Sequence, residues 1–183
     1  ANEYLKIILA HQPCGPYHFV GYSYGGFLGY EIARQLQQLG HRVDFVGVID
    51  TGPNPVSSSR DFASLANHSM QVVGNLPGWI GANCGSKNIK ETLKKANRQL
   101  RYIGRRIVTR GKTEYRFEDE FGDRRSHDHR REVLGRIFMS FNDYQPESYA
   151  GRVTLFRAAV RPLLHSLSLD LGWSSVAQEV IVH

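Results

Sequence analysis

The chain has 183 residues, enough for one globular domain, with 41% hydrophobic and 22% charged residues and a formal net charge of +6. No apolar run approaches the roughly 18 residues that a membrane span needs, and the N-terminus lacks a signal-peptide pattern, so we expect neither a membrane protein nor a secretory leader. The two cysteines, Cys14 and Cys84, lie 70 positions apart, which excludes a disulfide scaffold or a structural zinc site and favours a cytoplasmic protein.

The first 50 residues alternate between helical and strand patterns. Residues 3–11 favour a helix, and the aromatic and β-branched residues of 17–20 favour a short buried strand. Apolar residues then recur at helical spacing over about 25–39, with Gly40 just beyond the helix, and VDFVGVI at 43–49 indicates a second buried strand. A strand, a helix and a strand of these lengths form a βαβ unit, so we expect an α/β fold with a mostly parallel sheet.

Residues 60–148 differ in character and are interpreted as a helical lid inserted between two strands. Apolar residues spaced by three or four positions from Ile89 to Ile107 predict an amphipathic helix with a basic outer face, and a second helix is expected around 133–141. The segment 87–136 holds 16 of the 23 basic residues but 8 of the 17 acidic ones. It is either a solvated face or a docking surface for an acidic partner, and its interspersed acids and missing aromatic platform argue against nucleic acid.

The α/β pattern returns after the insertion. Val153–Phe156 predicts a strand, an irregular stretch leads to Trp173, and 179–183 predicts a last strand. The whole chain therefore fits one domain, 1–183, that contains the insertion.

The clearest chemical motif is Gly21-x-Ser23-x-Gly25, the pattern of a nucleophile elbow. It follows a predicted strand and opens a predicted helix, which is the context that such a motif requires. We expect both glycines to be needed because side chains there would clash with the neighbouring strand and helix. The turn would place the Ser23 hydroxyl at a helix N-terminus, where negative charge is stabilised. Neither dinucleotide-binding nor P-loop patterns occur.

A nucleophilic serine needs a base and a carboxylate that orients the base. Asp50 ends the strand that follows the elbow helix, 27 positions after Ser23, so it should lie at the same sheet edge. The later strand at 153–156 has no carboxylate at its end, which favours Asp50 as the acid. A plain turn residue is the alternative, because Asp before Thr-Gly-Pro is good turn chemistry.

No histidine fits the Ser, Asp, His order of this arrangement. Three histidines lie in or before the elbow unit, three lie in the insertion, and His165 has no strand directly before it. The final residue, His183, is a weak candidate because the base should come from a loop after the last strand.

Three segments together resemble the thioesterase domain that closes nonribosomal peptide synthetases and polyketide synthases. They are FVGYSYGGFLGYEIARQLQQLG, VGVIDTGPNP and GRVTLFRAAVRPLLHSLSLDLGW, in the family's order and spacing. The resemblance implies an α/β-hydrolase-type fold in which Ser23 is the nucleophile, Asp50 the acid and the Tyr24 N–H an oxyanion donor. It also implies a carrier protein as partner, whose phosphopantetheine arm brings the acyl chain, and no cofactor bound by this domain.

Two departures from the family are expected to matter. The family has further strands and a Gly-rich loop before the elbow, whereas only 16 residues precede Tyr17. The family's histidine follows the terminal strand, whereas His183 corresponds to the residue that ends it. We therefore expect a fragment that lacks the N-terminal strands, the first oxyanion donor and the histidine loop, with little or no catalysis by itself.

The leading expectation is release of a peptidyl or polyketide chain from its carrier through an acyl-serine, by hydrolysis or cyclisation. An esterase or lipase acting on oxygen esters is the alternative within the same fold. A non-catalytic remnant or docking module is the alternative from another class, because no catalytic histidine can be identified.

Overall fold

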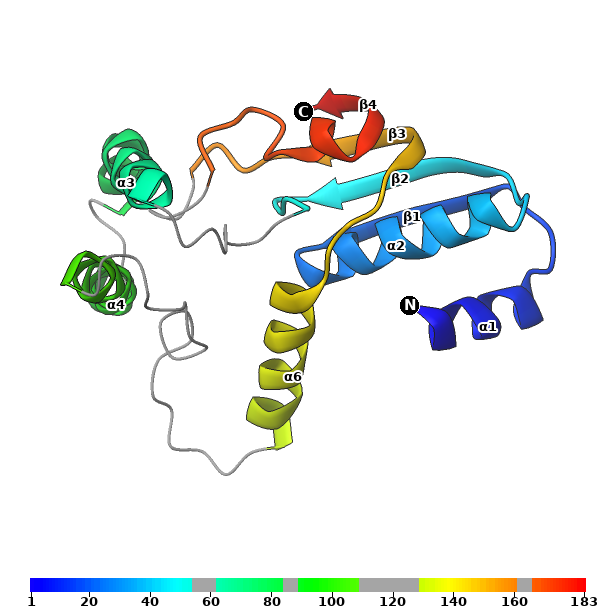
Figure 1. Ribbon diagram of the computed structural model, residues 1–183, viewed down its shortest axis with the longest axis horizontal. Helices are drawn as coiled ribbons and strands as arrows, with labels where there is room; N and C mark the ends of the chain where they lie inside the picture. The colour runs from blue at the N-terminus through cyan, green and yellow to red at the C-terminus, as the bar shows by residue number, and fades with distance from the viewer. Residues whose placement is uncertain (54–61, 84–88, 109–128, 161–165) are drawn as a thin grey trace. The chain divides into compact units, whose positions relative to one another are not determined.

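A computed structural model describes residues 1–53, 62–83, 89–108, 129–160 and 166–183 (Figure 1). The chain forms two compact units. The first comprises 1–55, 144–158 and 168–183, and the second comprises 56–143 and 159–167. The expected insertion, 60–148, covers most of the second unit.

The first unit is built on a four-stranded sheet in the order β1-β2-β3-β4. The strands are β1 (Tyr17–Tyr22), β2 (Val43–Ile49), β3 (Tyr149–Phe156) and β4 (Ala177–Val182). All neighbouring pairs are parallel, with Tyr22 opposite Ile49, Ile49 opposite Phe156, and Leu155 opposite Val182. The carboxyl ends of all four strands therefore form one edge of the sheet.

Two helices of the first unit lie on one side of this sheet, α1 (Asn2–His11) and α2 (Tyr24–Gln38) (Figure 1). Ile32 and Leu36 of α2 are buried against Tyr17 of β1. Partly buried apolar residues of α1 complete this cluster, namely Leu5, Ile8 and Leu9. Gly40 follows α2 with a φ of 81°, a conformation that glycine adopts without strain, and this ends the helix where the sequence predicts.

The second unit is helical in its described part. It contains α3 (Phe62–Asn83), α4 (Ile89–Val108) and α6 (His129–Asp143). Helices α3 and α4 contact one another, and Ala96 and Tyr102 of α4 are buried. In α3 the backbone at Gly74 lies close to Leu167, since a Cβ there would be 2.8 Å from that side chain.

Most predicted elements are confirmed in type, and several differ in extent. Strand β1 runs two residues beyond the predicted end, because Gly21 and Tyr22 of the elbow motif still pair with β2. Strand β3 begins at Tyr149, four residues before the predicted start. Helices α4 and α6 match the two predicted in the insertion, whereas α3 has no predicted counterpart because glycines and Pro77 interrupt its pattern.

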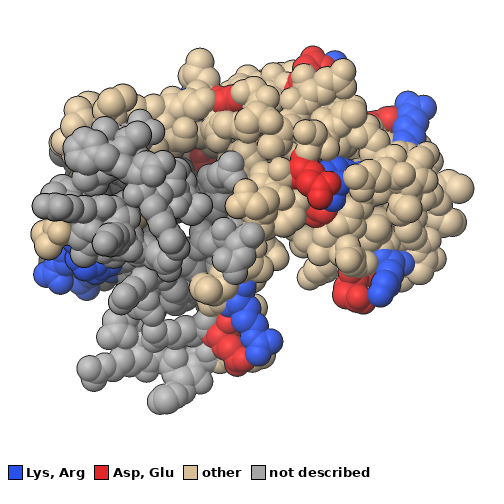
Figure 2. All heavy atoms as spheres, in the orientation of Figure 1, with Lys and Arg blue, Asp and Glu red and all other residues tan. Residues whose placement is uncertain are grey.

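Charged side chains on the face shown in Figure 2 often stand beside side chains of opposite sign. Exposed pairs that the structure describes include Lys6 with Glu3, Arg42 with Asp44, Arg136 with Glu132 and Arg152 with Glu179. Such pairs contribute little to stability because both partners are solvated. Of the basic segment 87–136, residues 87–88 and 109–128 lie outside the described part of the chain.

Candidate active site

The carboxyl-terminal edge of the sheet collects the predicted site residues. Ser23 follows β1, Asp50 follows β2, and His183 follows β4. Backbone hydrogen bonds continue the ladder past the strand ends: the Ser23 N–H donates to Ile49 O (3.1 Å), the Asp50 N–H to Phe156 O (2.9 Å) and the His183 N–H to Leu155 O (2.8 Å). The predicted placement of Ser23 and Asp50 at one edge, on neighbouring strands, therefore matches the structure.

Ser23 occupies a sharp turn between β1 and α2. Its φ of 52° and ψ of −123° lie in a region that residues with side chains rarely adopt. Its carbonyl accepts hydrogen bonds from the Gly26 N–H (3.1 Å) and the Phe27 N–H (3.3 Å), which start the helix. The exposed Ser23 side chain does not cap α2, so its hydroxyl is not committed to the helix. This is the geometry expected of a nucleophile elbow.

The glycine requirement of the elbow is confirmed at one predicted position and not at the other. A Cβ on Gly21 would lie 2.2 Å from the carbonyl carbon of Gly25, so only glycine fits there. Beyond its chain neighbours and the backbone of its own helix, a Cβ on Gly25 would meet no described atom within 4 Å, so the expected clash with the strand is not found there. The second tight position is Gly26, where a Cβ would lie 2.6 Å from the Gly21 carbonyl oxygen. The backbone of Gly21 therefore approaches the peptide that joins Gly25 to Gly26, whereas a side chain on Gly25 would lie outside this contact.

Tyr24 is the first residue of α2. Its N–H thus lies in the first turn of the helix, where the helix dipole favours negative charge. This position suits an oxyanion donor beside Ser23, which stays a prediction.

Asp50 is held by two hydrogen bonds to β3 and the residues that follow it. Besides the backbone bond to Phe156, its Oδ1 accepts a hydrogen bond from the Ala158 N–H (3.2 Å). Its φ of 52° places it in the left-handed region that disfavours residues with a side chain. The Asp50 turn is therefore a second constrained backbone beside the Ser23 turn, on the adjacent strand.

His183 continues the end of β4. Its carbonyl accepts a hydrogen bond from the Arg157 N–H (2.8 Å), and its ring stacks on that of Phe156 with centroids 5.6 Å apart. Among the histidines whose side chains the structure describes, at positions 11, 18, 41, 129 and 183, no ring hydrogen-bonds to Asp50 or Ser23. His41 lies against Tyr17, at the opposite end of the sheet from Ser23. His127, His165 and the side chain of His68 lie outside the described part of the chain.

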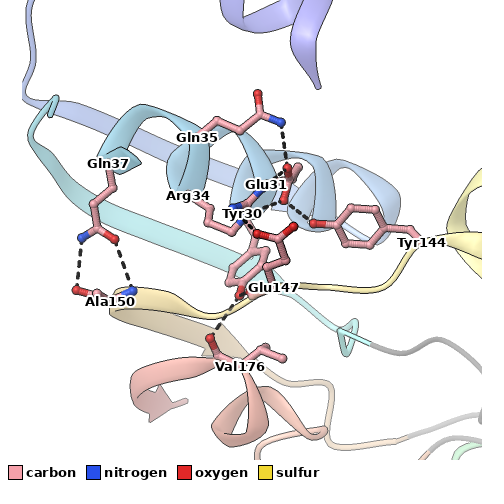
Figure 3. Close-up of polar contacts among 9 residues, drawn as sticks. All are labelled: Tyr30, Glu31, Arg34, Gln35, Gln37, Tyr144, Glu147, Ala150 and Val176. Atoms are coloured by element: carbon pink, nitrogen blue, oxygen red, sulfur yellow. Dashed lines mark hydrogen bonds and ion pairs between the residues drawn. The ribbon is translucent and has the colours of Figure 1, made fainter. Parts of the chain in front are cut away.

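A buried charged cluster, unforeseen from the sequence, joins α2 to the segment that leads into β3 (Figure 3). Arg34 donates to both carboxylate oxygens of Glu31, at 2.9 and 2.8 Å, and to Glu147 at 2.8 Å. The Tyr144 hydroxyl donates to Glu31, and its ring meets Phe27 edge-on with centroids 4.8 Å apart. The sequence signal was available, since Glu31 and Arg34 interrupt the apolar pattern of α2 three positions apart.

This cluster changes the protonation behaviour of its members. Burial alone would raise the pKa of Glu31, but hydrogen bonds from Arg34, Tyr144 and Gln35 outweigh it and lower the pKa. Burial and the hydrogen bond to Glu31 raise the pKa of Tyr144. Glu31 is therefore ionised and Tyr144 neutral over the physiological pH range.

Two features are absent from the described ranges, a membrane-spanning helix and a cluster of metal-ligating side chains. No helix there is long and apolar enough to cross a membrane. No group of three or more metal-ligating side chains gathers in those ranges.

Comparison with known proteins identifies relatives among large synthetases. Over 74 residues the chain is 42% identical to "Inactive atromentin synthetase invA6" of Paxillus involutus, which is 40% of this chain and 8% of that protein. Over 76 residues it is 37% identical to "Polyketide synthase PksR" of Bacillus subtilis, which is 42% of this chain and 3% of that protein. The chain thus spans only a small part of the curated relatives that it matches.

The fold has a counterpart among solved structures. A four-domain nonribosomal peptide synthetase, holo-AB3403 bound to AMP and glycine, aligns with 100% of this chain and 13% of its own, with a TM-score of 0.52 and 20% identity. At this identity the likeness speaks for the fold alone, and the predicted α/β-hydrolase-type fold is confirmed.

The family itself is shown by a model of the thioesterase domain, which matches residues 1–132. This match covers well over half of the chain and includes both constrained turns at the sheet edge. The protein therefore belongs to the thioesterase domain family.

Proposed function

We propose that the chain is the acyl-releasing part of a multidomain synthetase, with Ser23 as nucleophile and Asp50 as the acid. The observation that carries this proposal is the pair of constrained turns on neighbouring parallel strands, Ser23 at φ 52° and Asp50 at φ 52°. Strained backbone at the end of parallel strands is typical of catalytic residues in α/β folds. A plain turn would not need both positions to be held in this way.

The proposed reaction begins with a thioester that joins the acyl chain to the phosphopantetheine arm of a carrier protein. A histidine takes the proton of Ser23, whose Oγ attacks the thioester carbonyl. The N–H of Tyr24 stabilises the resulting oxyanion, the C–S bond breaks, and the thiol leaves with the proton. Water, or a nucleophile within the acyl chain itself, then attacks the acyl-serine, and the Ser23 oxygen leaves with a proton as the hydroxyl.

The described contacts do not supply the base of this proposal. The Ala158 N–H bonds to Oδ1 of Asp50. Asp50 can therefore orient a histidine through its other carboxylate oxygen, Oδ2, which can accept a hydrogen bond. The domain binds no cofactor of its own in this scheme, since the phosphopantetheine belongs to the carrier. We also propose the carrier as partner and the cytoplasm as location.

The test is acylation of Ser23 by a fluorophosphonate, read by intact mass, in this chain and in the longest natural protein that contains it. We expect labelling in the longer protein, its loss in Ser23→Ala, and a decrease of about 100-fold or more in Asp50→Asn, which removes the charge that orients the base. A pantetheine thioester should then be cleaved faster than the matched oxygen ester. Absence of labelling in both proteins would contradict the proposal.

The second candidate is a non-catalytic module. It is favoured by one observation, that none of the histidine side chains that the structure describes hydrogen-bonds to Asp50 or Ser23. Labelling of the longer protein that is lost in Ser23→Ala would exclude it.

A further inference from the structure

The turn after Asp50 is contacted by a tryptophan from a distant part of the sequence. Trp173, in the connection between β3 and β4, is fully buried, and its Nε1–H donates a hydrogen bond to the carbonyl of Thr51 at 2.7 Å. Thr51 directly follows Asp50 and is itself buried. The bond thus fixes the backbone one residue beyond the proposed acid.

The same connection also contacts the next residue of the turn. A Cβ on Gly52 would lie 2.4 Å from the carbonyl oxygen of Leu171, so the two backbones touch. With the bonds from Asp50 to Phe156 and Ala158, the turn is held on the β3 side and on the Trp173 side. A left-handed Asp backbone persists only when its surroundings impose it.

Trp173 is itself held in place by the loop that precedes it. The Asp170 carboxylate accepts hydrogen bonds from the N–H groups of Gly172 and Ser174, both at 3.0 Å, and from the Ser168 hydroxyl. Burial alone would raise the pKa of Asp170, but these hydrogen bonds lower it, so the carboxylate stays charged at neutral pH. The loop therefore presents the indole in one orientation.

Helix α2 also contacts the indole. The Tyr30 ring lies 4.8 Å from that of Trp173, centroid to centroid. Its hydroxyl is placed to donate to the carbonyls of Glu147 (2.6 Å) and Val176 (3.1 Å) (Figure 3). Because α2 begins directly after Ser23, the indole connects the helix of the nucleophile with the turn of the acid.

We propose that Trp173 is a positioning residue, whose indole N–H holds the Asp50 turn in its left-handed conformation. The inference rests on the proposed function for its catalytic meaning. Whether the Trp173 hydrogen bond stabilises the Asp50 turn can be measured without any catalysis. Simple core packing of the indole ring would not depend on the N–H.

The primary experiment is amide hydrogen exchange in Trp173→Phe, which keeps an aromatic ring and removes the donor. The reporters are the amides of Asp50 and Ala158, which bond to Phe156 O and to the Asp50 carboxylate. We expect both to exchange at least about fivefold faster, while the Val46 amide in the middle of β2 keeps its rate. Unchanged rates at Asp50 and Ala158 would overturn the proposal, and so would an equal acceleration at all three amides.

Two further variants separate the N–H from packing. Leu36→Ala removes a fully buried side chain from the Tyr17 and Ile32 cluster, and should accelerate exchange evenly across the sheet. Replacing Trp173 with benzothienylalanine keeps the two-ring shape, exchanges the N–H for sulfur, and should reproduce the local acceleration of Trp173→Phe. A benzothienylalanine protein with wild-type exchange at Ala158 would assign the indole to packing and overturn the proposal.

The effect of Trp173 on catalysis through Asp50 is tested by the pH dependence of the rate of fluorophosphonate labelling in the longer protein. A nearby carboxylate raises the pKa of a histidine, so a displaced Asp50 should shift the acidic limb of the rate profile to lower pH. We expect this shift in Trp173→Phe and in Asp50→Asn, and not in Leu36→Ala. If the wild-type protein is not labelled, the proposed function fails, whereas the exchange data still decide whether Trp173 holds the turn.

Discussion

The backbone of Ser23 is kept in an unfavourable conformation by its immediate neighbours. A non-glycine residue in this region costs about 1–3 kcal/mol. The compensation comes from the ladder bond to Ile49 and from the two helix-starting N–H groups that bond to the Ser23 carbonyl. The close approach of Gly21 and Gly26 makes room for this turn. The conformation of the Ser23 turn therefore depends on contacts with β2 and with the start of α2.

The two glycines that flank Ser23 offer a matched pair of substitutions. Gly21→Ala should destabilise the protein by about 3 kcal/mol or more, because its Cβ would overlap backbone atoms that cannot move aside. Gly25→Ala should leave stability unchanged or raise it by up to about 1 kcal/mol, since alanine is the better helix former and meets no described atom. Urea unfolding of both variants measures the difference. Equal losses in the two would refute the assignment of the tight contact to Gly21 and Gly26.

The residues that directly follow the strands could be predicted from the sequence. The residues that hold the turns in place could not. The positions of Ser23 and Asp50 could be predicted because a strand, a turn and a helix each leave a local sequence pattern. Gly26 and Trp173 were not, because their roles arise from contacts with Gly21 and Thr51 that no local pattern records. Gly25 was assigned a clash for the same reason, since motif spacing alone does not tell which glycine meets the strand.

At the scale of elements, helix α2 carries two kinds of contact. One side packs apolar residues on the sheet, and another holds the buried pair of Glu31 and Arg34, whose side chains are each 9% exposed. Tyr144 and Glu147 bring the chain back to this helix just before β3. A buried pair of this kind is costly to break, because the remaining charge loses its partner.

Glu31→Gln should destabilise the protein by about 3 kcal/mol at pH 7, because Arg34 and Tyr144 would lose a charged acceptor. The control is Glu3→Gln, whose partner Lys6 is 73% exposed, with an expected loss below about 0.5 kcal/mol. Since folding lowers the pKa of Glu31, its contribution is fully present above the ordinary value of 4.5 and is lost as the pH falls through the folded-state value. Urea titrations at several pH values measure this. A Glu31→Gln loss that does not shrink in acid would contradict the assignment.

Of the helices in the second unit, α4 could be predicted from its sequence pattern, whereas α3 could not. The apolar spacing of α4 was decisive, because an amphipathic helix repeats its pattern over many turns. Helix α3 contains Pro77, and its glycines resemble loop signals, yet the backbone stays helical through them. Strand β3 extends back to Tyr149 because its first residues pair with β4, a contact that lies outside the strand itself.

At the scale of the whole molecule, neighbouring strands of the sheet are separated by very different lengths of chain. Residues 23–42 connect β1 to β2, and 157–176 connect β3 to β4. The connection between β2 and β3 spans 50–148 and includes most of the second unit. Closing this longer loop costs roughly 1–2 kcal/mol more in chain entropy than closing either short one.

This difference predicts an order of events in folding. The pairing of β2 with β3 should be the latest of the three, because its entropy cost is largest before any contact repays it. Pulsed hydrogen exchange during refolding can follow it: amides of the β1–β2 ladder, such as that of Ile49, whose carbonyl accepts the Ser23 N–H, should be protected before those of Asp50 and Ala158. Simultaneous protection of all these amides would show that the long connection does not delay the sheet.

The parallel order of the strands then has a consequence for a newly made protein. Asp50 acquires its bonds to Phe156 and Ala158 only when β3 joins β2. A molecule that has formed its first βαβ unit would already display a shaped serine turn, but Asp50 would still lack a fixed orientation. Under the proposed function, such an intermediate would be inert towards acyl chains until β3 has paired with β2.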